Sequence, residues 1–221
     1  VEGLSNKTKA RILGIASSRL RAHGDLATAL RLTRESYEHA VKDWNETNSS
    51  SMSPDEQASR GQVHQQRLNV QARHRAELLT FVGRLDEAEV IAGCSVQYAA
   101  NSENPHSQLI AHSVAGWVAH QRGKWSDALQ SFGRAEEIYR RIGGERTLLH
   151  TLWGYRYAEL LTESGRSQEV HERAAQAIVW ARADLEPGAR PDPMFSLGLL
   201  DLPLAHLMRV LADCADAEAT Q

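Results

Sequence analysis

Arg122-Gly123-Lys124-Trp125-Ser126-Asp127-Ala128-Leu129 is the stretch of sequence that decides the fold. It lies between two segments in which apolar residues recur with the period of an α-helix. Gly123 suits the end of the first helix, because glycine adopts a positive φ without strain. Ala128, five positions later, is small enough to let the second helix lie close against the first. The stretch therefore predicts a tight turn between two antiparallel helices.

The same phrase occurs at three other places in the chain. In each copy a glycine is followed five residues later by a small residue, at Gly24 and Ala29, at Gly83 and Ala88, and at Gly165 and Val170. The four glycines are separated by 59, 40 and 42 residues. A period of about 40 residues is typical of stacked helix hairpins. The longer first interval contains a polar segment, 45–53, and Ser53-Pro54-Asp55-Glu56, which has the pattern of a helix start.

Helical periodicity extends over most of the chain, and the alternating pattern of β-strands is absent. We therefore expect an all-α fold with helices at 5–22, 25–43, 54–82, 85–100, 106–122, 125–142, 146–164, 167–184 and 194–213. They form about four repeats in a single domain over 1–221, at 5–43, 54–100, 106–142 and 146–184, with a terminal helix at 194–213. The chain begins without Met and ends after half a repeat, so we expect a fragment of a longer protein.

Composition limits the classes of partner. The 221 residues carry a net charge of -3 with a pI near 6.4. Direct binding to nucleic acid or to an anionic membrane is not expected, because no basic excess exists. No apolar run reaches the roughly 20 residues that cross a bilayer. Cys94 and Cys214 stand among small apolar residues, which predicts buried free thiols and a cytoplasmic location.

The repeated phrase resembles the tetratricopeptide repeat. The third copy places Gly116, Gly123, Ala128, Phe132 and Ala135 at intervals of 7, 5, 4 and 3 residues, which is that family's pattern. The fourth copy keeps these intervals with Ala158, Gly165, Val170, Ala174 and Ala177, and the first two copies follow them loosely. The resemblance implies a right-handed superhelix whose first helices line a concave surface that binds proteins or peptides.

The repeats depart from the family in one respect. Tetratricopeptide repeats have 34 residues, whereas two of the intervals here are 40 and 42. Longer repeats are similar to those of bacterial signalling ATPases and related transcription regulators. The leading hypothesis is a protein- or peptide-binding scaffold. The alternative is a ligand-sensing regulatory segment of a larger bacterial signalling ATPase or transcription regulator.

Candidate binding residues follow from the intervals before each turn glycine. The concave positions of the second to fourth copies are Arg73, Glu77, Ser113, Trp117, His120, Gln121, Tyr155, Arg156 and Glu159. Tryptophan, tyrosine and arginine are the residue types that anchor interfaces. The alternative is that Trp117 and Tyr155 pack between neighbouring hairpins. Glu77 and Glu159 stand where a carboxylate clamp of this family would have asparagine, so we expect no such clamp.

Motifs for catalysis are missing from the sequence. It has no Walker motif, no Gly-x-Gly-x-x-Gly and no Gly-x-Ser-x-Gly. His112 and His120 are eight residues apart, and no His-x-x-x-His or Cys-x-x-Cys pair occurs. We therefore expect no enzymatic activity, no metal and no cofactor. The unpaired helix at 194–213 suggests self-association, because an uncapped repeat array exposes apolar surface.

Overall fold

The computed structural model describes residues 3–48, 54–142, 146–189 and 198–219. Every regular element in these ranges is a helix, which confirms the predicted all-α class. The chain divides into two compact units, Val1–Arg122 and Gly123–Gln221. The sequence predicted one domain over 1–221, and the boundary between the units falls at the turn of the expected third repeat.

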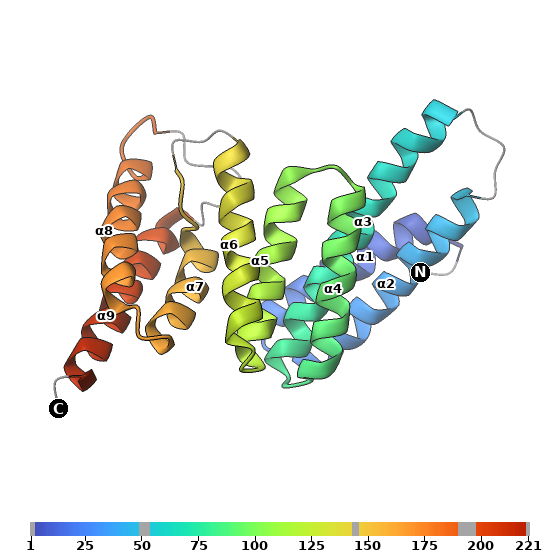
Figure 1. Ribbon diagram of the computed structural model, residues 1–221. Coiled ribbons are helices and arrows are strands. Elements are labelled where there is room, and N and C mark those ends of the chain that lie inside the picture. Colours follow the sequence, from blue (N-terminus) through green and yellow to red (C-terminus); the bar gives the residue numbers. More distant parts are fainter. Residues whose placement is uncertain (1–2, 49–53, 143–145, 190–197, 220–221) are drawn as a thin grey trace. The chain divides into compact units, whose positions relative to one another are not determined.

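The described residues of the first unit form five helices, which are labelled in Figure 1. They are α1 (Asn6–Ala22), α2 (Leu26–Asn48), α3 (Pro54–Phe81), α4 (Leu85–Asn101) and α5 (Pro105–Gln121). α1 packs against α2, and α3 packs against α4, so each turn glycine joins the two helices of a hairpin. α3 also packs against α2 and α5, which places it at the centre of this unit.

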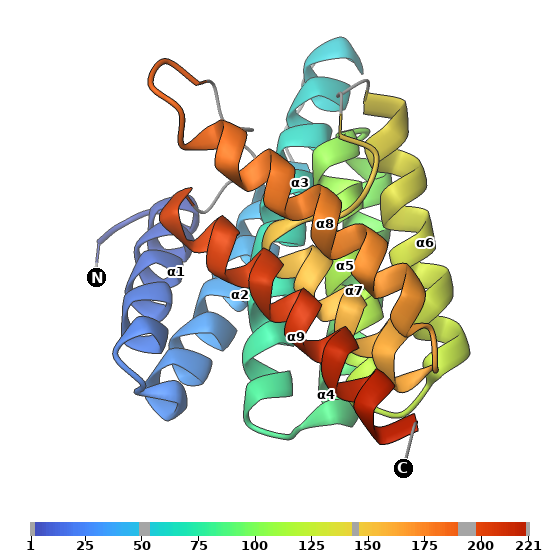
Figure 2. The same ribbon diagram turned by 90° about the vertical axis from the view of Figure 1, so that its left-hand side faces the viewer.

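The second unit contains α6 (Trp125–Ile142), α7 (Thr151–Glu163), α8 (Ser167–Asp184), a short 3₁₀ helix η1 (Gly198–Leu200) and α9 (Asp201–Ala219). α7 and α8 form a hairpin, and α9 packs against both of its helices. Figure 2 shows α9 running beside α8. The terminal helix is therefore the third member of a small bundle within this unit.

The turn glycines have the predicted conformation. Gly24, Gly83, Gly123 and Gly165 have φ values of 83°, 77°, 72° and 72°. At three of these turns the residue after the glycine donates its N–H five residues back, from Asp25 to Leu20, from Arg84 to Leu79 and from Arg166 to Leu161. This is the Schellman motif, which satisfies carbonyl groups at a helix end. The small residues five positions later, Ala29, Ala88, Ala128 and Val170, are 0% exposed, as close helix packing requires.

Helix starts also follow local chemistry. Side-chain oxygens of Ser5, Asp25 and Asn104 accept the backbone N–H of the residue three positions later, at 3.3, 3.1 and 3.0 Å. These are N-caps, which satisfy donors that the first helical turn leaves free. α3 begins at Pro54 as predicted, and Pro105 is the first residue of α5. Proline suits this position because its missing N–H would have no helical partner.

Two predicted helix boundaries, the end of α2 and the start of α7, were wrong. α2 continues to Asn48 rather than ending at 43, and the Trp44 ring packs 5.3 Å from the His64 ring of α3. α7 begins at Thr151 rather than 146. The backbone N–H of Leu149 is donated to the Glu136 carboxylate at 2.9 Å, and this bond holds the preceding segment outside the helix.

The terminal helix begins later than expected. It starts at Asp201 and ends at Ala219, whereas the prediction was 194–213, of which 194–197 lies outside the described residues. The preceding turn is the 3₁₀ helix at Gly198–Leu200, where Gly198 has a positive φ of 63°.

The predicted burial of both thiols was also wrong. Both cysteines are free, but Cys94 is only partly buried and Cys214 is exposed.

Candidate functional site

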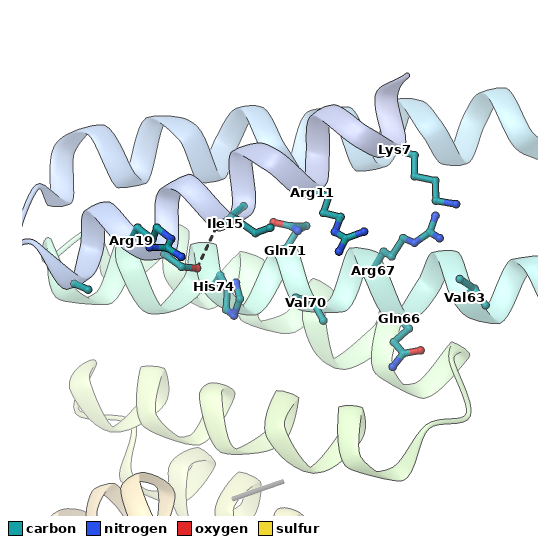
Figure 3. A pocket seen from close by; sticks show the side chains of 13 residues that line it. Lys7, Arg11, Ile15, Arg19, Val63, Gln66, Arg67, Val70, Gln71 and His74 are labelled. Carbon is teal, nitrogen blue, oxygen red and sulfur yellow. Dashed lines mark hydrogen bonds between the residues drawn. The ribbon is translucent and has the colours of Figure 1, made fainter. Parts of the chain in front are cut away.

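A groove of about 860 Å³ lies between α1 and α3, entirely within the first unit. α1 and α3 are the first helices of their hairpins. The groove follows α1 from Lys7 to Ala22 and α3 from Val63 to His74. Figure 3 shows Lys7, Arg11 and Arg67 extending from the two helices toward the space between them. The groove is therefore elongated along both helix axes.

The floor of the groove depends on a glycine in the middle of α1. A Cβ atom at Gly14 would lie 3.0 Å from Gln71 Nε2 and 3.1 Å from Gln71 Oε1. Gly14 therefore leaves room for the Gln71 side chain to lie against α1. Ser36 of α2 donates a hydrogen bond of 2.7 Å to Gln71 Oε1, which fixes that side chain. Three helices thus meet at this point.

One end of the groove is tied by an ion pair. Arg21 of α1 donates to Glu77 of α3 at 2.7 Å, and the Glu77 side chain is only 10% exposed. A partly buried ion pair of this kind loses less to solvent screening than an exposed one. It holds the last turn of α1 against α3 and so fixes the spacing of the two helices there.

Aliphatic side chains line the groove without being covered. Ile15 of α1 is 52% exposed and Val63 of α3 is 45% exposed, and Val70 and Ala22 lie in the same groove. Large aliphatic side chains are among those that proteins most often bury. A groove that collects several of them offers apolar area to a ligand.

The charge of the groove has one sign. Lys7, Arg11, Arg19 and Arg67 line it, and no carboxylate does among the residues that the structure describes. Arg67 Nη1 lies 3.6 Å from Asp43 Oδ2. Within the part of the chain that the structure describes, the other three cations form no ion pair. The 17 residues of α1 include five basic side chains and no acidic one. All charged side chains on the α1 side of the groove are therefore positive.

His74 lies in the groove but adds no charge at neutral pH. Burial lowers the pKa of His74 to about 4, and the neighbouring positive charge of Arg73 acts in the same direction. Its imidazole is therefore neutral above about pH 5. The positive charge of the groove therefore comes from its Lys and Arg side chains and not from His74.

The predicted site residues of α3 lie beside this groove rather than in its lining. Glu77 forms the ion pair with Arg21 described above. Arg73 is partly buried next to His74, and burial lowers the pKa of Arg73. Its Nε lies buried without a hydrogen-bond partner among the described residues. Arg73 and Glu77 are thus on the same helix as part of the groove lining, but they are not among the residues that line it.

The predicted residues of α5 are mostly buried. Ser113, Trp117 and His120 are 0%, 6% and 5% exposed, whereas Gln121 is exposed. Ser113 donates its hydroxyl to the Leu109 carbonyl of its own helix at 3.0 Å. The Trp117 ring lies 5.2 Å from the Phe81 ring of α3. Trp117 of α5 therefore contacts α3 of the preceding hairpin, whereas the sequence left open whether it lines a binding surface or packs between neighbouring hairpins.

The predicted residues of α7 belong to the second unit. Arg156 is 5% exposed, and its guanidinium lies 4.8 Å from the centre of the Trp153 ring. Tyr155 and Glu159 are partly buried. Burial and the Glu159 carboxylate, which accepts its hydrogen bond, raise the pKa of Tyr155. A single groove through the residues of α3, α5 and α7 stays a prediction, since they are divided between the two units.

Sequence reasoning missed the residues of α1. The candidate residues predicted from sequence all lie in the second, third and fourth copies. None of them is on the first helix of the first copy. The available signal was its composition, because segment 6–22 contains five basic residues, no acidic one, and Ile12 and Ile15. These two isoleucines are 42% and 52% exposed.

Comparison with protein-family models and with curated proteins gives no significant match. None of the described helices combines the length and the apolar composition of a membrane-crossing segment. The described side chains include no group of three His, Cys, Asp or Glu residues close enough to hold a metal ion. The groove between α1 and α3 is the candidate site because it combines cationic and exposed aliphatic side chains.

Proposed function

We propose that this chain is a protein-binding module whose groove between α1 and α3 takes an acidic peptide segment with apolar side chains. One observation carries the proposal. The groove of about 860 Å³ combines four cationic side chains with exposed aliphatic ones and contains no carboxylate in its lining. A ligand that complements it carries negative charge and apolar groups along the same length.

The dimensions of the groove support a peptide. It extends along α1 from Lys7 to Ala22, which corresponds to about 22 Å of helix at about 1.5 Å per residue. This length accommodates about four turns of a ligand helix, or about seven residues of extended chain. A compact metabolite would contact only part of such a groove. An amphipathic helix in a groove is a common mode of peptide recognition.

The chemistry of the lining supports negative charge in the ligand. Arginine presents a planar fork of N–H donors that matches a carboxylate, and Arg11, Arg19 and Arg67 supply three of these. Ile15 and Val63 supply apolar area that is still exposed. A basic segment would meet repulsion along the whole groove, so charge also selects against the wrong partners.

The resemblance to tetratricopeptide repeats supports the same reading. In that family the first helix of each hairpin lines the concave, binding side of a right-handed superhelix. α1 and α3 are both first helices. The proposal therefore includes a tetratricopeptide-like array in which the ligand contacts the first two repeats, rather than the residues of α5 and α7.

Fluorescence anisotropy with labelled 15-residue peptides tests this function. Three peptides share the same leucine positions and carry glutamate, glutamine or lysine between them. We expect the glutamate peptide to bind most tightly, and its affinity to fall with added salt because the groove cations are exposed. Replacing Arg11 and Arg19 together by glutamine is expected to weaken its binding by about tenfold or more, which corresponds to about 1.4 kcal/mol.

The matched control removes two arginines elsewhere. Arg134 and Arg141 are exposed on α6 and both pair with Glu137, so their replacement by glutamine changes net charge equally. We expect this control to bind the glutamate peptide as the original chain does. Unchanged binding in the Arg11/Arg19 variant would contradict the proposal. So would equally tight binding of a single-stranded oligonucleotide or of anionic phospholipid vesicles, since both carry charge without the matching apolar side chains.

A further inference from the structure

A second, smaller pocket lies between α2, α3 and the turn before α4, also within the first unit. Its volume is about 240 Å³, and its lining includes Arg31, Arg34, Arg75, Arg84 and Glu87. Four arginines therefore line one small space together with a single carboxylate residue. Sites for drug-sized ligands have volumes of about 300–1,000 Å³, so this pocket suits one small charged group rather than a large molecule.

Three of the arginines have local partners on the surface. Arg31 Nη1 lies 2.9 Å from Glu35 Oε1, and Arg34 Nε lies 3.7 Å from Glu38 Oε1. The Arg84 guanidinium makes two hydrogen bonds of 2.6 Å to Glu87. These pairs join residues three or four positions apart, and exposed pairs of this kind are worth about 0–1 kcal/mol. They hold the arginines loosely and leave them able to bind another anion.

Arg75 differs from the other three. It forms no ion pair with any carboxylate that the structure describes. Its guanidinium lies 5.8 Å from the centre of the Tyr37 ring, and its Nε is buried without a hydrogen-bond partner among the described residues. A buried N–H of a charged group that lacks an acceptor is unfavourable. Among the described residues Arg75 is therefore the one arginine of this lining without a carboxylate partner, and an anion in the pocket would supply one.

We propose that this pocket binds a phosphate group. An oxyanion with several acceptor oxygens can receive N–H donors from more than one guanidinium, and arginine binds phosphate in a bidentate manner. At neutral pH phosphate carries between one and two negative charges, and the lining has an excess of arginines over carboxylates to pair with them. The proposal is independent of the peptide groove, whose lining shares no residue with this pocket.

The test is isothermal titration of the whole chain with sodium phosphate, with sodium chloride as the reference at equal ionic strength. We expect saturable phosphate binding that chloride does not reproduce. Arg75→Gln is expected to weaken binding at least about tenfold, and Arg75→Lys to weaken it less, because lysine keeps the charge but not the fork. Arg134→Gln, which removes an exposed arginine from α6, is expected to bind as the original chain does.

Arg84→Gln provides a second variant in case Arg75→Gln does not fold, since the Arg84 side chain is 52% exposed. It is expected to weaken phosphate binding as well. Glycerol 3-phosphate distinguishes the sources of the group. Tighter binding than inorganic phosphate identifies a phosphorylated molecule as the ligand, and equal binding identifies phosphate itself. Heat of binding that chloride reproduces, or that both the Arg75→Gln and Arg84→Gln variants retain, would overturn the proposal.

Discussion

The Glu136 carboxylate and the Arg173 guanidinium form a buried ion pair in the second unit. Arg173 donates hydrogen bonds of 2.6 and 3.1 Å to the two oxygens of Glu136, and the side chains are 8% and 9% exposed. Glu136 Oε1 also accepts the backbone N–H of Leu149 at 2.9 Å. One carboxylate therefore joins α6, α8 and the segment that precedes α7.

Glu136→Ala is expected to destabilise the second unit by about 3 kcal/mol. Removing one partner of a buried ion pair leaves the other charge without compensation, which costs about 3–5 kcal/mol. The lower value is expected because Glu169 also accepts a hydrogen bond from Arg173, at 2.9 Å. Urea denaturation followed by tryptophan fluorescence measures the change. Glu137→Ala is the control, since that neighbouring side chain is 50% exposed, and an equal loss in both variants would refute the assignment.

Gly83→Ala and Gly93→Ala are expected to change stability in opposite directions. Gly83 has a φ of 77°, and Gly93 lies inside α4. A Cβ atom would meet no other group within 4 Å at either position, so only the backbone differs. Alanine in the left-handed region costs about 1–2 kcal/mol, whereas alanine in a helix gains up to about 1 kcal/mol over glycine. Thermal denaturation of the two variants checks this, and a shift of equal sign would contradict it.

The first unit is expected to lose stability as the pH falls from about 6.5 to about 4. The pKa of His74 is about 4 in the folded chain, because it is buried beside Arg73 and Arg21, with Glu77 opposing them. The unfolded chain protonates His74 first, at its ordinary pKa of about 6.5. The contribution is therefore fully present above pH 6.5 and decreases by up to about 3 kcal/mol by pH 4.

Urea midpoints between pH 5 and pH 7 measure that loss. His74→Gln is expected to flatten the pH dependence in this interval, because glutamine takes up no proton. His23→Gln serves as the control, since His23 is exposed at the end of α1. A His74→Gln variant that loses stability as steeply as the original chain would show that another group is responsible.

Self-association is expected to depend on the exposed face of α9. Leu207 and Val210 are 48% and 50% exposed, and Leu199 and Leu200 of η1 are 77% and 60% exposed. Light scattering is expected to give a mass that rises with concentration. The double variant Leu207→Glu and Val210→Glu is expected to abolish the increase of mass with concentration, because it places charge on the apolar face of α9. Ile12→Glu, on α1, controls for added charge, and a constant mass of the original chain would exclude this contact.

The hairpins were predictable because their causes are local. A positive φ at Gly165 and a small residue at Val170 follow from the turn itself, whatever lies elsewhere in the chain. The N-cap at Asn104 and the start of α3 at Pro54 are local in the same sense. The secondary structure can be predicted from sequence because these local signals agree with the global fold.

The groove and the start of α7 were not predictable in this way, because they depend on residues distant in sequence. Leu149 is kept out of a helix by Glu136, and Glu77 is drawn into an ion pair by Arg21, 56 residues away. The rotation of α3 about its axis decides whether Glu77 or Arg67 faces the groove. Periodicity identifies the apolar face of a helix, but it does not fix which neighbouring helix covers that face.

The absence of acidic residues from α1 has a consequence for the speed of recognition. The 17 residues of this helix carry five positive charges with no negative one between them, so their fields add. For an acidic partner, such a surface accelerates diffusional encounter and orients the partner before contact. Association rates above about 10⁶ M⁻¹s⁻¹ at low ionic strength are typical of such steering. In the proposed peptide complex we expect dissociation to depend instead on apolar contacts at Ile15 and Val63, so that charge sets the association rate and aliphatic packing sets the lifetime.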